Sequence, residues 1–122
     1  MLKWGAAAML LTLMAAAPAA AEGDAGRGKT VFGRCSACHA VTEQNKVGPH
    51  LSGVFGRPAG TVAGARYSKA MTASGITWDE KTLDAFLTEP AKVLPGTTMA
   101  IRLPNPQDRA DVIAYLKILA SP

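Results

Sequence analysis

Cys35, Cys38 and His39 form the clearest chemical pattern in this sequence. They lie in the run Cys35-Ser36-Ala37-Cys38-His39, which has the C-x-x-C-H spacing of c-type haem attachment. On a helical turn, two thiols three positions apart point to the same side, and each can form a thioether to a vinyl group. The imidazole of His39, next in the chain, can then bind the iron from one face. The spacing therefore predicts one covalently bound haem c with His39 as an axial ligand.

Three other uses of a Cys-x-x-Cys pair stay open at this point. A redox-active dithiol of the thioredoxin type belongs beside a β-α-β unit, and the sequence shows no such alternation. A zinc site has few ligands to draw on, since His50 is the only other histidine and His39 directly follows Cys38. A plain disulfide between Cys35 and Cys38 is the third alternative. We favour haem over these alternatives. The haem interpretation also makes a demand that the rest of the chain can be checked for, namely a second axial ligand or an open site.

A haem iron bound by His39 requires either a second axial ligand or an open site. A methionine ligand raises the reduction potential of the iron and closes it to other ligands. Three of the five methionines lie in the N-terminal leader considered below, and Met71 and Met99 remain. Met71 falls in a predicted short helix, where a methionine is usually a core residue. Met99 follows Pro95 in a stiffened loop that could hold a weak thioether ligand, so we expect Met99 to be the second ligand.

The first 21 residues have the features of an export signal. Lys3 precedes an apolar run, and Ala19-x-Ala21 fits a signal-peptidase cleavage site. One alternative is an uncleaved membrane anchor, because residues 4–21 reach the short end of spanning length. A buried helix of the folded domain is another alternative, but no charge marks a solvent face. We expect cleavage, export to an oxidising compartment such as the periplasm, and a single domain over residues 22–122.

The composition indicates an ordinary small globular domain. Of 122 residues, 48% are hydrophobic and 18% are charged, which excludes a disordered chain, a coiled coil and a collagen-like repeat. The formal net charge is +4, but no run of Lys and Arg is dense enough to predict nucleic-acid binding. Few aromatic residues in so short a chain predict a thin core that a bound group must supplement.

The elements that position these residues are predicted to be helices joined by long loops. The segment 40–66 is rich in Gly and Pro and alternates like a strand only around Val54-Phe55. The fold class is therefore all-α, with loops wrapped around the bound group. Capping residues and apolar spacing predict four helices: 24–34 behind Asp24, a short one over 67–73, one from a capping box at Thr77 to Pro90, and one from Asn105 and Pro106 to about Leu119.

With these features together, the sequence resembles the class I cytochromes c, in their mitochondrial-like and bacterial periplasmic branch. The resemblance covers nearly all of residues 24–119. It implies an all-α fold in which the first and last helices cross, with Gly28 and Phe32 near Tyr115 and Leu116. The motifs that carry it are Cys35–His39, Val47-Gly48-Pro49-His50-Leu51, Gly75-Ile76-Thr77-Trp78, Pro95-Gly96-Thr97-Thr98-Met99 and Asp111-Val112-Ile113-Ala114-Tyr115-Leu116-Lys117.

The resemblance also implies roles for individual residues. Met99 matches the axial methionine, and the carbonyl of Pro49 matches the acceptor for the His39 ring proton. Further residues are implied to bind the haem, three of them around its propionates and one in the Pro95–Met99 loop, which we call the methionine loop: Arg57, Tyr67, Trp78 and Thr97. Basic residues implied to surround the exposed haem edge, where partners dock, are Arg34, Lys46 and Lys92.

Two positions depart from the family pattern. Phe86 stands where a tyrosine often donates a hydrogen bond to the methionine sulfur, and phenylalanine cannot donate one. Met71 stands where a polar residue often lies near the buried propionate. Both changes are expected to alter the reduction potential.

The resemblance implies a monomeric one-electron carrier in a respiratory or photosynthetic chain, which transforms no substrate. Its implied partners are a quinol-cytochrome c reductase and a terminal oxidase, or periplasmic redox enzymes with acidic docking patches. The alternative is a haem enzyme or a gas- or peroxide-binding sensor with an open sixth site. The Pro95–Met99 loop favours the carrier.

Overall fold

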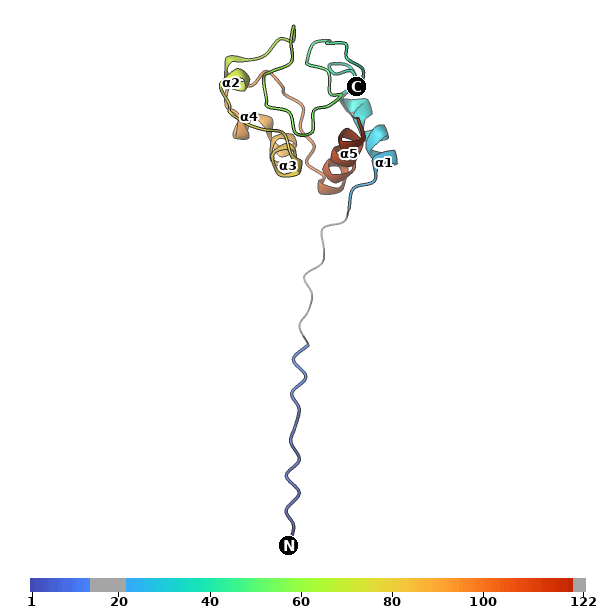
Figure 1. Cartoon of the computed structure of the whole chain (residues 1–122), viewed down its shortest axis with the longest axis vertical. Helices are drawn as coiled ribbons and strands as arrows, with labels where there is room; N and C mark the ends of the chain where they lie inside the picture. Colours follow the sequence, from blue (N-terminus) through green and yellow to red (C-terminus); the bar gives the residue numbers. More distant parts are fainter. Residues whose placement is uncertain (14–21, 120–122) are drawn as a thin grey trace.

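The computed structural model describes residues 1–13 and 22–119, and the secondary structure of these residues is helical (Figure 1). Among the described residues the only β-pairing is an isolated antiparallel bridge between Pro58 and Thr77. The prediction of an all-α fold with long loops is therefore confirmed. In chain order, the elements are α1 (Ala25–Val31), the 3-10 helix η1 (Phe32–Arg34), α2 (Lys69–Thr72), α3 (Glu80–Thr88), α4 (Pro90–Val93) and α5 (Pro106–Ile118).

The first and last helices pack against each other, as the family resemblance implies (Figure 1). Gly28 is buried at the contact, where an added β-carbon would lie 1.9 Å from the carbonyl oxygen of Asp111. Only glycine allows the two backbones to approach so closely. Phe32 packs edge-on against Tyr115, with 5.6 Å between ring centroids. The α1–α5 pair thus forms a rigid base directly before the two cysteines.

The predicted caps of the first and last helices are confirmed, but two predicted helix starts are too early: the short helix α2 begins at Lys69 behind Ser68 and not at position 67, and α3 does not begin at Thr77. Asp24 caps α1, and Asn105 caps α5 with Pro106 in its first turn. The predicted start at Thr77 is incorrect, because the residues on either side of Thr77 are hydrogen-bonded to the segment around Pro58. The amide of Trp78 donates to the carbonyl of Arg57 at 3.0 Å, and the amide of Ala59 donates to the carbonyl of Ile76 at 2.7 Å. The capping box lies two residues after Thr77. Asp79 accepts a hydrogen bond from the backbone of Thr82, and the Thr82 side chain accepts one from Asp79.

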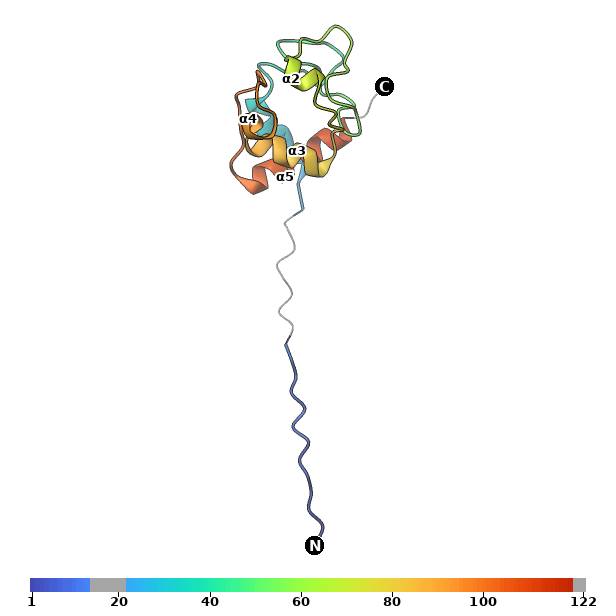
Figure 2. The same ribbon diagram turned by 90° about the vertical axis from the view of Figure 1, so that its left-hand side faces the viewer.

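Pro90 ends the predicted helix but also begins another, the short helix α4, which the sequence analysis did not include. A proline in the first turn of a helix lacks only an amide proton that would have no intrahelical partner. Helix α3 contacts both α4 and α5, and Figure 2 shows α3 crossing α5. The methionine loop leaves the end of α4, so this helix sets where the loop starts.

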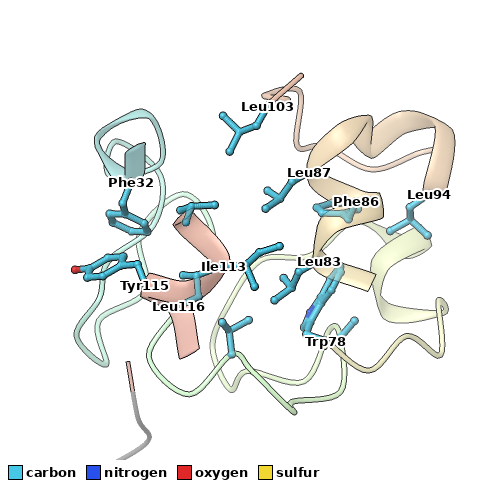
Figure 3. Packing of buried hydrophobic residues seen from close by; sticks show 13 residues of the cluster. Phe32, Trp78, Leu83, Phe86, Leu87, Leu94, Leu103, Ile113, Tyr115 and Leu116 are labelled. Atoms are coloured by element: carbon cyan, nitrogen blue, oxygen red, sulfur yellow. The ribbon is translucent and has the colours of Figure 1, made fainter. Parts of the chain in front are cut away.

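The buried hydrophobic residues form one cluster, which extends from the α1–α5 pair to α3 (Figure 3). Phe32, Tyr115 and Leu116 lie on the α1–α5 side, and residues of the α3 region lie across from them. Trp78 and Phe86 pack together on the α3 side, with ring centroids 5.1 Å apart. Half-buried side chains that pack against the core include Cys35, Leu51, Met71 and Met99.

Of the predicted leader, residues 1–13 are exposed and form no helix. Residues 14–21, which include the predicted cleavage site, lie outside the described residues. A search of the described residues found no helix that is long and apolar enough to cross a membrane.

Candidate haem site

A cavity of about 360 Å³ is lined by residues from both sides of this cluster. Its volume falls within the range of small-molecule and cofactor sites. Its walls come from the C-x-x-C-H turn, the loops over 47–57 and 66–68, α2, α3, the methionine loop and α5. All nine residues that the sequence analysis assigned to haem line it: Cys35, Cys38, His39, Pro49, Arg57, Tyr67, Trp78, Thr97 and Met99.

The turn that follows η1 places both cysteines on the cavity wall. The backbone amide of Cys38 donates to the carbonyl of Cys35 at 3.1 Å, and that of His39 donates to the same carbonyl at 2.9 Å. The two thiols are free and not bonded to each other. Burial raises the pKa of Cys35, and the nearby charge of Arg34 only partly opposes this. A raised pKa disfavours the reactive thiolate that a thioredoxin-type site needs.

The His39 ring is held by its neighbours in the loop that follows. Its Nδ1 atom lies 2.7 Å from the carbonyl oxygen of Pro49. Because that carbonyl can only accept, Nδ1 carries the proton and Nε2 keeps its lone pair. Burial lowers the pKa of His39, while the Pro49 carbonyl opposes this shift. A neutral imidazole with a free Nε2 is the form that binds a metal ion.

Met99 and Met71 both line the cavity, and both are half-buried. The backbone amide of Met99 donates to the side-chain oxygen of Thr97 at 3.3 Å, so Thr97 supports the loop as well as lining the cavity. Met71 lies in α2, whose first turn is capped by Ser68. Two thioether side chains therefore face one cavity, and the sequence alone favours Met99.

Two of the three predicted propionate residues, Arg57 and Tyr67, form a polar sector of the wall, whereas Trp78 also lines the cavity but packs against Phe86. Arg57 is half-buried and donates to the backbone carbonyls of Ser52 at 3.3 Å and His50 at 3.1 Å. Burial lowers its pKa, so the guanidinium is a desolvated cation. The Tyr67 oxygen accepts from the amide of Val62 at 3.1 Å, which leaves its own proton free to donate. This sector could satisfy a carboxylate turned into the cavity.

Several further residues line the cavity that the sequence analysis did not assign to haem. Arg66 precedes Tyr67 and is exposed at the cavity wall, so its position beside a predicted ligand was the available signal. Val47 and Ile101 line the cavity with 73% and 45% of their surface exposed. Phe86 is buried against Trp78 and provides no hydroxyl to the cavity.

The three predicted docking residues differ in their surroundings. Arg34 lines the cavity and forms an ion pair of 3.2 Å with Asp108, in which both side chains are partly exposed. The ammonium group of Lys46 donates to the backbone carbonyl of Ser36, beside the cysteines. Lys92 is exposed on α4 and does not line the cavity. Arg34 and Lys46 are therefore next to the attachment motif, and Lys92 lies on the helix that leads into the methionine loop.

The donor set and the shape of the cavity fit a haem c. Two thiols, an imidazole and a thioether share one largely apolar cavity with a guanidinium and a phenol. Most of the cavity lining is apolar, so a large apolar group that fills the cavity would remove this surface from water. The chain is therefore shaped for a large apolar group bound between its two hydrophobic sides.

Comparisons with known proteins agree with this geometry. The family model described as "Cytochrome c" matches residues 25–120. A cytochrome c of Tetrahymena pyriformis is 54% identical over 98 residues, which cover 79% of this chain and 89% of the relative. A cytochrome c2 of Rhodomicrobium vannielii is 50% identical over 107 residues, which cover 85% of this chain and 86% of the relative.

Solved structures also match. Cytochrome cH from Methylobacterium extorquens superposes with a TM-score of 0.75 at 44% identity, covering 78% of this chain and 98% of that one. Cytochrome c2 from Rhodospirillum centenum superposes with a TM-score of 0.77 at 36% identity, covering 81% of this chain and 100% of that one.

Proposed function

Since this chain belongs to the cytochrome c family, whose members are electron carriers with one covalently bound haem c, we propose that it is a periplasmic electron carrier. We propose that His39 and Met99 are the two axial ligands of its haem iron. The observation that carries the proposal is the convergence of both residues and both cysteines on one cavity. The haem supplies a reversible one-electron couple, Fe(III)/Fe(II). The protein attaches the haem, orients it and protects it from water.

The protein part of this function follows from the contacts of the ligands. The hydrogen bond from His39 to Pro49 fixes the ring tautomer and makes Nε2 a stronger base, which favours the oxidised iron. A thioether ligand from Met99 favours the reduced iron and leaves no open position for a substrate. The half-buried cation of Arg57 also favours the reduced iron, because the oxidised iron carries one more positive charge.

The visible spectrum of the oxidised holoprotein tests the ligand set. Methionine ligation should give the weak far-red sulfur-to-iron band. Met99→Ala should abolish this band and let the reduced protein bind carbon monoxide. Met71→Ala is the matched control and should keep the band, because it removes the other cavity methionine. If Met71→Ala loses the band and Met99→Ala retains it, the assignment is wrong. A wild-type protein that lacks the band and binds carbon monoxide would support the open-site alternative.

The two thioether bonds need a separate test. Cys35→Ser and Cys38→Ser should each leave a single bond, and replacement of both should make the haem extractable with acidified organic solvent. Haem that resists extraction from the double variant would contradict the proposed attachment.

We further propose that residues 1–21 are removed on export. In support, residues directly after the predicted cleavage site already contact the folded domain. The Gln107 side chain donates to the carbonyl of Glu22 at 3.3 Å, and the amide of Asp24 donates to Asp111 at 2.8 Å. The mass of the holoprotein purified from the periplasm tests this. A protein that begins at Glu22 supports cleavage, and a full-length protein in the membrane fraction supports the anchor.

For partners, we propose membrane redox complexes of the reductase and oxidase type with acidic docking patches. The support is the position of the cations Arg34 and Lys46 beside the attachment motif. Opposite charges speed a brief encounter without requiring a large interface. Cross-linking of the periplasmic holoprotein in native membranes, followed by mass spectrometry, would identify the partners. Cross-links that avoid the Arg34 and Lys46 side would contradict this docking surface.

A further inference from the structure

The chain segment that carries Met99 is exposed between two buried anchors. Residues 95–102 are exposed except for Thr97 and Met99, which are half-buried. Leu94 is 9% exposed at the start of this segment, and Leu103 is 1% exposed at its end. We call residues 95–102 the Met99 segment. Its few buried contacts make the position of Met99 depend on how firmly the two anchors are held.

The anchor at Leu103 is held through its backbone as well as its side chain. The amide of Leu103 donates to the carbonyl of Leu87 in α3 at 2.7 Å. The carbonyl of Leu103 accepts from Nη1 of Arg109 in α5 at 2.9 Å, and the carbonyl of Pro104 accepts from the same atom at 3.0 Å. A single guanidinium therefore binds two successive carbonyls where the Met99 segment ends.

The guanidinium of Arg109 is itself fixed. Its Nε atom donates to Asp84 of α3 at 2.8 Å, and the Arg109 side chain is only 11% exposed while that of Asp84 is 50% exposed. Charge-assisted hydrogen bonds of a buried guanidinium are stronger than those of an exposed pair. Arg109 thus joins three parts of the molecule: α5, α3 and the end of the Met99 segment.

From these contacts we infer that Arg109, oriented by Asp84, is a positioning residue that keeps the Met99 segment closed over the iron. The inference rests on the proposed ligation by Met99. Thioether sulfur is a weak ligand, so the bond persists only while the segment holds the sulfur in place. We call the contacts of Arg109 with Asp84 and with the carbonyls of Leu103 and Pro104 the clamp. Loss of the clamp should raise the population of molecules in which the segment is open and Met99 is detached from the iron.

Imidazole binding to the oxidised holoprotein measures this open population. A ligand that binds only the open form has an apparent affinity proportional to the fraction that is open. We expect Arg109→Gln to bind imidazole about tenfold more tightly than the wild type, since it loses charged hydrogen bonds to the segment. Arg109→Lys keeps the charge with a single donor group, and Asp84→Asn keeps the acceptor without its charge. Both should show smaller increases of the same sign.

Lys117→Gln is the matched control. Lys117 forms an ion pair of 3.0 Å with Glu80, which also joins α5 to α3 but does not contact the Met99 segment. This variant makes the same charge change and should bind imidazole like the wild type. Unfolding by guanidinium chloride is measured for each variant, so that a general loss of stability is seen separately.

The outcomes separate this inference from the ligand proposal. If the wild type lacks the far-red band, ligation by Met99 fails and the clamp fails with it. If the band is present but Arg109→Gln, Arg109→Lys and Asp84→Asn all bind imidazole like Lys117→Gln, only the clamp is refuted, even where unfolding stability falls. If Arg109→Gln yields no folded holoprotein, Arg109→Lys and Asp84→Asn decide the question alone.

Discussion

Gly48 packs against the ring of His39 so closely that a β-carbon on Gly48 would lie 2.5 Å from Cε1 of the imidazole and 2.9 Å from Nδ1. The amide of Gly48 also donates to the carbonyl of Cys38 at 2.8 Å. The loop that supplies the Pro49 carbonyl therefore packs directly against the imidazole ring of His39, the proposed iron ligand. The tautomer and the orientation of the ring both depend on this contact.

Gly48→Ala should displace the His39 ring and weaken the hydrogen bond to Pro49. A β-carbon at this distance cannot be accommodated without a shift of the ring or of the backbone. We expect a destabilisation of about 1–3 kcal/mol, a typical cost of overpacking. We also expect a changed reduction potential, since a weaker hydrogen bond makes His39 a weaker base. Guanidinium unfolding and potentiometry of the holoprotein measure the two effects.

Gly33→Ala is the control for this prediction. Gly33 lies two residues before Cys35, and an added β-carbon there meets no atom within 4 Å. Its potential and stability should stay near those of the wild type. Equal behaviour of the two alanine variants would show that the Gly48 contact does not position the ring.

Arg57→Gln should lower the reduction potential on the order of tens of millivolts. The half-buried guanidinium opposes the extra positive charge of oxidised iron, and its removal therefore stabilises the oxidised form. Arg66→Gln removes the same charge from an exposed side chain at the same cavity, where water and salt screen it. Its shift should be smaller and should shrink at high ionic strength. Equal shifts for the two variants would contradict the proposal that the half-buried Arg57 acts on the iron more strongly than the exposed Arg66 does.

Asp108→Asn should speed electron transfer to an anionic oxidant. Asp108 pairs with Arg34 at the cavity, so this carboxylate partly cancels the positive charge that attracts a partner. With ferricyanide as the probe, we expect the second-order oxidation rate to rise about twofold at low ionic strength and to approach the wild-type rate as salt increases.

Glu80→Gln makes the same charge change on a residue that pairs with Lys117 and does not line the cavity. It should change the ferricyanide rate much less. If both variants accelerate the reaction equally, net charge decides the rate, and the placement of Arg34 does not.

Asp111→Asn should remove a pH-dependent part of the stability. The Asp111 side chain is buried and accepts from the amide of Asp24, from the Gln107 side chain and from Arg27. These hydrogen bonds, chiefly that from Asp24, lower its pKa in the folded protein. The ionised Asp111 carboxylate therefore makes its full contribution to the free energy of unfolding above the unfolded-state pKa of about 4. This contribution is lost as the pH falls through the lower folded-state pKa.

Guanidinium unfolding of the wild type and of Asp111→Asn, measured at a series of pH values, tests this. The wild type should be more stable at neutral pH, and the difference should decrease below about pH 4. A difference that stays constant down to pH 2 would mean that the carboxylate charge contributes nothing.

The helix ends illustrate how far local sequence reasoning extends. Asp24 and Asn105 cap helices as predicted, because a cap depends on a side chain and amides two or three residues away. Thr77 fails as a cap because the next residue, Trp78, is hydrogen-bonded to Arg57 beside the bridge between Thr77 and Pro58. No local pattern reports that pairing, so the start of α3 was placed too early.

The sequence by itself determined the cofactor chemistry, since two thiols and an imidazole within five residues need only one helical turn to face the same side. Every residue that the sequence analysis assigned to haem lines the cavity, although other lining residues such as Arg66 were not assigned. The tertiary structure alone decided which of the cations are paired, how the Gly48 loop presses on His39, and that Arg109 reaches the carbonyls at the end of the Met99 segment. These contacts join residues that are distant in the chain, and their distances are set by how the helices and loops pack around one cavity.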